Sequence, residues 1–158
     1  ASLAALLGAE QGDMAALLVE ELERHLGTLD SVRKMLAADR QERIRRAAER
    51  ADGMHLILVG GEEIDGLADE LVSTFRFAKV EWICGEYGKV PSVAKVEQAR
   101  PESHVVVIIT DHSGHDLTGN AEEACRKAGV TPARCGQWGK SSIERTVLDA
   151  LAPPSGGA

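Results

Sequence analysis

Short apolar segments alternate with stretches that carry apolar residues at helical spacing over the last two thirds of the chain. Continuous apolar runs are typical of strands buried on both faces of a parallel sheet. The second segment alternates polar and apolar residues instead, so we expect it at an edge of the sheet. The predicted strands are residues 55–59, 79–84, 105–109 and 131–135.

Strand and helix alternate with short connections, which favours right-handed crossovers and a parallel sheet. We therefore predict an α/β fold, a small flavodoxin-like or Rossmann-like sheet of four strands in the order 2-1-3-4. In such sheets ligands bind beyond the carboxyl ends of the strands, at the point where the strand order reverses. That point lies between the first and third strands, so the loops that follow them are the predicted site.

The N-terminal part has a helical pattern without strands. Gly27 is expected to end one helix and Thr28 to cap the next, which predicts a helical hairpin. The apolar stripe of this region exceeds what one small sheet needs, so we predict a homodimer formed through these helices. The predicted division is a helical region over 1–53, an α/β domain over 54–152 and a disordered tail over 153–158.

The net charge of −7 argues against general nucleic-acid binding, because phosphate neutralisation requires clustered cations. The arginines between Arg40 and Arg50 alternate with acids, which is typical of a solvated helix face. No apolar run approaches the roughly 20 residues that span a bilayer, so no membrane segment is expected. The three cysteines show no metal-finger spacing, which favours reduced thiols and a cytoplasmic location.

The third predicted strand is followed directly by Asp111, His112 and, after two small residues, His115. Imidazole and carboxylate groups at this position could ligate a divalent metal, and an imidazole could ligate a haem iron. His112 and His115 share one helical face if a helix begins by Ser113. The alternative is a pair of surface histidines, with Asp111 or Ser113 capping the helix.

Two thiols are expected at the same edge, because Cys84 ends the second strand and Cys135 ends the fourth. A thiolate there could be an iron ligand or a redox sensor, and the alternative is a partly buried structural thiol. Cys125 lies on an apolar helix face and is predicted to be a small core residue.

Two further segments could bind an anion. Gly60 and Gly61 would allow a phosphate to approach the backbone, but the favoured interpretation is a tight turn between strand and helix. Lys140, Ser141 and Ser142 open the last helix and offer a cation, hydroxyls and backbone N–H groups, or an ordinary serine cap. Trp138, just before them, is a candidate stacking surface.

These segments resemble a bacterial family, the domain of unknown function 2325 family, over about residues 54–151. The resemblance rests on Leu56 to Gly61, on the strand from Val105 to Asp111 with His115 after it, and on Gly139 to Arg145. The family has a Ser-His pair where this chain has Gly114 and His115, so the imidazole matches and the serine does not. Members called "domain related to iron" are implicated in haem binding and respiratory regulation.

Two functions follow as expectations. The resemblance implies a haem-linked sensor or regulator. Taken with the residues, this gives a non-enzymatic cytosolic regulatory module that binds haem or a metal, forms a homodimer through its N-terminal helices and has a regulatory protein partner. The alternative is a small-molecule or nucleotide-binding signalling module that uses Gly60, Gly61 and the Lys140-Ser141-Ser142 segment. No set of nucleophile, base and orienting residue indicates an enzyme.

Overall fold

The computed structural model describes residues 3–85 and 89–154. The chain forms two compact units, residues 1–42 and residues 43–158. None of the helices that the structure describes combines the length and apolar character needed to cross a bilayer.

The N-terminal region is one continuous helix, α1 (Leu3–Ala51), so the predicted helical hairpin is wrong. Gly27 lies inside the helix, and open space surrounds the position where a side chain would begin. Thr28 caps nothing, because its hydroxyl donates to the Arg24 carbonyl (3.0 Å) one turn earlier. A helical glycine costs about 1 kcal/mol relative to alanine, and a long helix absorbs that cost.

The last turns of α1 belong to the α/β unit, which therefore begins at Arg43 and not at residue 54. Ala47 and Ala51 are buried in its core. Arg43 pairs with Asp149 (3.1 Å). Turn residues follow Ala51, and Gly53 adopts a φ of +76° before the first strand.

Four parallel strands form the sheet, in the order β2-β1-β3-β4, as the sequence predicts. The alternating strand β2 lies at an edge, also as predicted. The elements in chain order are β1 (His55–Val59), α2 (Leu67–Phe75), β2 (Lys79–Ile83), α3 (Ala94–Glu97), β3 (His104–Ile109), α4 (His115–Ala128), β4 (Ala133–Cys135) and α5 (Lys140–Ala150).

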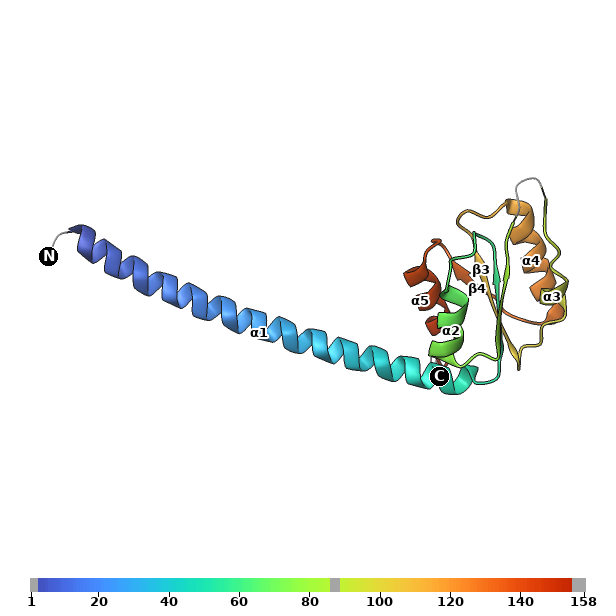
Figure 1. The fold of residues 1–158 in the computed structure, drawn as a ribbon, viewed down its shortest axis with the longest axis horizontal. Helices are drawn as coiled ribbons and strands as arrows, with labels where there is room; N and C mark the ends of the chain where they lie inside the picture. The colour runs from blue at the N-terminus through green and yellow to red at the C-terminus, as the bar shows by residue number, and fades with distance from the viewer. Residues whose placement is uncertain (1–2, 86–88, 155–158) are drawn as a thin grey trace. The chain divides into compact units, whose positions relative to one another are not determined.

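Helices cover both faces of the sheet, with α2 and α5 on one face and α3 and α4 on the other (Figure 1). Successive strand residues point to opposite faces, so Leu56 and Leu58 pack towards α2 and α5. Ile57 and Val59 pack towards α3 and α4. Cys125 is buried on that second face and is a core residue, as expected.

After α5 the chain reaches Pro153 and Pro154 without regular secondary structure. The rest of the tail that the sequence predicts to be disordered, residues 155–158, lies outside the described residues.

We expect Leu58→Ala to lower the free energy of unfolding by about 2–5 kcal/mol, because it leaves a cavity in the middle of the sheet. Leu58 is 0% exposed, on the central strand β1. Val90→Ala is the matched control, since Val90 is 51% exposed and its truncation should change stability by less than about 0.5 kcal/mol. Urea unfolding of both variants measures the difference, and equal losses would contradict this assignment of the core.

Candidate functional site

The carboxyl edge of the sheet is held together by hydrogen bonds between neighbouring strand ends. The amide of Gly60, after β1, donates to the Ile83 carbonyl on β2 (2.9 Å). The amide of Thr110, after β3, donates to the Cys135 carbonyl on β4 (2.9 Å). All four strands therefore lead into one connected set of loops.

Ser113 joins the loops that follow β1 and β3. Its hydroxyl oxygen accepts a hydrogen bond from the Gly61 amide (3.0 Å) and its O–H donates to the Ile109 carbonyl (2.5 Å). A side chain on Gly60, whose φ is +96°, would overlap Ser113 Oγ. The small residue at position 60 is therefore explained by the approach of Ser113.

Trp138 covers the other glycine of the pair. Its indole N–H donates to the Glu62 carbonyl (2.9 Å), and its amide donates to Asp111 Oδ2 (3.2 Å). A Cβ on Gly61, whose φ is +67°, would lie 2.5 Å from Trp138 Cδ1. The indole of Trp82, on β2, donates to the Gly60 carbonyl of the same loop (2.8 Å). Two tryptophans therefore fix the β1–α2 loop.

The donors that the sequence suggests for binding an anion already have partners within the protein. The Gly61 amide bonds to Ser113, and Lys140 Nζ pairs with Glu70 Oε2 (2.6 Å), a hydrogen bond that raises the pKa of Lys140. Helix α5 begins at Lys140 with Gly139 as its N-cap and no side-chain cap. The prediction that Ser141 or Ser142 caps this helix is therefore wrong.

Both histidines of the predicted site lie in or next to the loop between β3 and α4. His115 is the first residue of α4, and His112 precedes the helix with a φ of +55°. The helix begins after Ser113, so the condition under which the two histidines would share a helical face is not met. The N-cap of α4 is Gly114 without a side-chain bond, so neither Asp111 nor Ser113 caps it.

The imidazole of His112 lies beside Trp138, with ring centroids 6.0 Å apart in an edge-on arrangement. His112 Nε2 is 3.7 Å from Asp111 Oδ2. Among the residues that the structure describes, His115 makes no side-chain hydrogen bond or ion pair, and its side chain is exposed. The site thus presents one partnered and one unengaged imidazole.

The two thiols lie at opposite sides of the sheet. Cys135 is buried on β4, and its thiol donates to the Gln137 carbonyl (3.0 Å). Cys84 follows β2 and is half-buried, and desolvation raises the pKa of its thiol. Three strand spacings of about 4.8 Å separate these strands, so the thiols cannot both ligate one iron.

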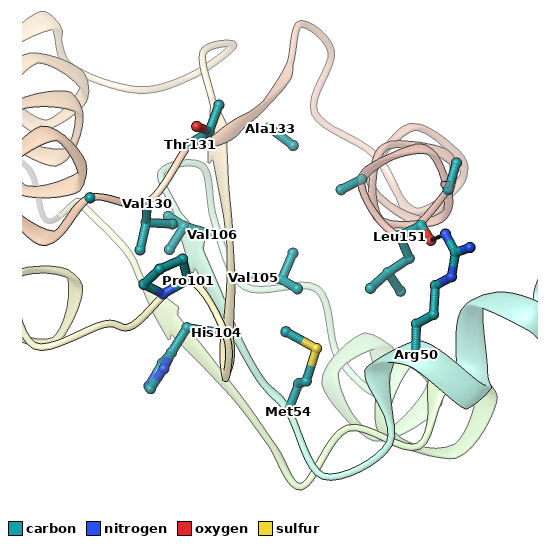
Figure 2. A pocket seen from close by; sticks show the side chains of 13 residues that line it. Arg50, Met54, Pro101, His104, Val105, Val106, Val130, Thr131, Ala133 and Leu151 are labelled. Carbon is teal, nitrogen blue, oxygen red and sulfur yellow. Dashed lines mark hydrogen bonds between the residues drawn. The ribbon is translucent and has the colours of Figure 1, made fainter. Parts of the chain in front are cut away.

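A cavity of about 370 Å³ lies at the opposite, amino-terminal edge of the sheet (Figure 2). Met54, Val105 and Leu151 give it apolar walls, and the Arg50 guanidinium donates to the Leu151 carbonyl (2.9 Å). Burial and the neighbouring His55 lower the pKa of His104, which also lines it. Sequence reasoning missed this cavity because its lining comes from separate segments without a shared motif.

We expect Gly61→Ala to lower the free energy of unfolding by about 2–4 kcal/mol, because it adds both backbone strain and a clash with Trp138. Gly66→Ala separates the two effects: the φ is +77° there and the added Cβ meets open space, so about 1 kcal/mol is expected. Gly136→Ala, with neither feature, is the neutral control. Thermal or urea unfolding measures all three, and similar losses for Gly61 and Gly66 would show that Trp138 does not pack there.

Comparison of the chain with protein-family models, with curated proteins and with solved structures finds no match. The functional assignment therefore depends on the chain's own residues and on the resemblance noted in its sequence.

Proposed function

We propose that the chain is a cytosolic, non-enzymatic regulatory module that would hold a haem through His115, with His112 next to it, and that acts as a homodimer. The observation that carries the proposal is the position of His112 beside the exposed indole of Trp138, with the exposed His115 at the start of α4, at the edge where parallel sheets bind ligands. Trp138 is 38% exposed and offers an apolar surface to a porphyrin.

The donor set favours haem over a bare metal ion. Within residues 3–85 and 89–154, no group of three or more His, Cys, Asp or Glu residues is arranged to hold a metal ion. A haem iron already has four porphyrin nitrogens and needs only one or two protein ligands. Two histidines are therefore sufficient for haem and too few for a closed site of protein ligands.

Imidazole is a better candidate than thiolate at this edge. The Cys135 thiol is buried and bonded to a carbonyl, and the Cys84 thiol has a raised pKa, so its thiolate form is disfavoured. His115 is exposed and without a bonded partner in the described part of the chain. These differences make His115 the first ligand of the proposal.

A bound iron could act on the loops through Ser113. Ser113 lies between the two histidines in sequence, and its hydroxyl bridges the Gly61 amide and the Ile109 carbonyl. Movement of His112 or His115 towards an iron would pull on this bridge and on the loop after β1. That loop is where we place the signal to a regulatory protein partner.

The Ser113 hydroxyl already takes part in two hydrogen bonds, one with the Gly61 amide and one with the Ile109 carbonyl. These bonds disfavour a role for Ser113 as a catalytic nucleophile.

The alternative, a nucleotide or small-molecule module, has less support. It depends on the Gly61 amide and the Lys140 ammonium, and these donors already bond to Ser113 and Glu70. A phosphate would have to displace both partners and also the Trp138 indole that lies against Gly61.

The homodimer is supported by the exposed apolar stripe of α1. A solvated helix rarely leaves a continuous apolar face uncovered, and most helical stability in proteins comes from packing such a face. The large apolar residues of the stripe are between 45% and 72% exposed: Met14, Leu17, Leu18, Val19, Leu22, Leu26, Leu29, Val32, Met35 and Leu36.

Titration with haemin tests the ligand. We expect the full chain to shift the absorption spectrum of haemin, and His115→Ala to return it towards that of haemin in buffer and to weaken binding at least about tenfold, because the imidazole that would hold the iron is lost. His112→Ala should keep the shift, because His115 remains. His25→Ala, which removes another exposed imidazole, should also keep it. A wild-type spectrum identical to that of haemin in buffer would contradict haem binding, and an unchanged His115→Ala spectrum would contradict the assigned ligand.

Light scattering at micromolar concentration tests the assembly. We expect twice the mass of one chain, and a monomer for Leu22→Glu combined with Leu29→Glu, because these changes place charges on the apolar stripe. Leu22→Met combined with Leu29→Met keeps the same positions apolar at similar volume and should remain dimeric. A monomeric wild-type chain would contradict the homodimer.

A further inference from the structure

We propose that the two copies of α1 pack antiparallel, about a two-fold axis near Gly27. This inference rests on the proposed homodimer and adds its geometry. It follows from the spacing of the apolar residues in the part of α1 from residue 13 to residue 41, and from the net charges of the halves before and after Gly27.

The exposed stripe follows the seven-residue repeat of a coiled coil. Leu22, Leu29 and Leu36 occupy one of its two core positions, and Leu18 and Val32 occupy the other. These residues are 45–64% exposed, which leaves the whole seam available to a second helix. Three repeats separate Ala15, which shares the core position of Leu22, from Leu36, the length for which such a pattern is meaningful.

In an antiparallel pair, core residues equidistant from Gly27 meet across the interface. Leu18 then packs against Leu36 of the second copy, and Leu22 packs against Val32. The core position at residue 25 meets Leu29, so the imidazole faces an aliphatic side chain. That position can be polar because the His25 ring nitrogen Nδ1 lies 2.8 Å from the Glu21 carbonyl of its own helix.

A parallel pair would also align leucines, but it would bring the two His25 rings together in the core. The apolar pattern alone does not choose between the orientations, whereas the charges do.

The two halves of the segment carry opposite net charge. Residues 13–26 contain four acids and one arginine, a net charge of −3 with neutral His25. Residues 28–41 contain two acids and three cations, a net charge of +1. Intrahelical pairs such as Arg24 with Glu20 and Lys34 with Asp30 are included in these totals, so the net charge is what a partner helix meets.

Orientation decides which halves become neighbours. Two parallel copies would place the acidic halves side by side, within a Debye length of about 8–10 Å, at an interaxial distance of about 8–10 Å. Two antiparallel copies place each acidic half beside the half that contains Arg33, Lys34 and Arg40. Coulomb energy therefore favours the antiparallel pair.

Pulsed electron paramagnetic resonance on the full chain distinguishes the two orientations. Spin labels are attached to Gly27→Cys or to Gln41→Cys in a Cys84→Ser background, since Cys125 and Cys135 are buried. The two sites are a multiple of seven residues apart and so lie on the same side of the helix.

For the antiparallel dimer we expect a short intermolecular distance at position 27 and an axial separation of roughly 42 Å at position 41, from the rise of 1.5 Å per residue. Equal short distances at both positions would show a parallel pair and overturn the inference while leaving the homodimer intact. Absence of any intermolecular distance, together with a monomeric mass, would instead overturn the homodimer. Added salt should raise the dissociation constant of the antiparallel dimer and lower that of a parallel one.

Discussion

Strands β1 and β3 lie in the middle of the sheet and are covered by helices on both faces. After their first residues, Leu56 to Val59 and Val106 to Ile109 are almost completely removed from solvent. A polar group in such a strand would have to be buried at a cost of about 1–3 kcal/mol unless it found a partner. The described residues contain no buried polar or charged side chain, so polar side chains are confined to the loops and to partly or fully exposed surfaces.

The same constraint made the fold predictable from the sequence. The apolar runs that begin near His55 and at Val105 are typical of strands buried on both faces, and the alternating residues from Lys79 favour an edge strand. The strand order 2-1-3-4 then followed from the short connections. The helical hairpin was wrong for a local reason: Gly27 ends a helix only when its backbone turns left-handed, and nothing in the neighbouring residues reveals whether it does.

The site was predictable as a place but not as a set of contacts. The sequence placed Asp111, His112 and His115 correctly at the carboxyl edge, because they follow an unmistakable strand. It could not show that Ser113 would bond to Gly61, 52 residues away, or that Trp138 would lie against the same glycine. The Gly60-Gly61 pair indicated that some group lies close to the backbone. Both a phosphate and a neighbouring side chain require glycine at such a position, so the pair could not show which of them it is.

Trp82 and Trp138 have a joint consequence for spectroscopy. They are the chain's two tryptophans, and their indole N–H groups donate to the carbonyls of Gly60 and Glu62. Both fluorophores are therefore attached to the β1–α2 loop, although one comes from β2 and the other from the loop after β4. The tryptophan emission of the protein thus reports on the loop between β1 and α2 at one edge of the sheet, and scarcely on α1, which contains no tryptophan.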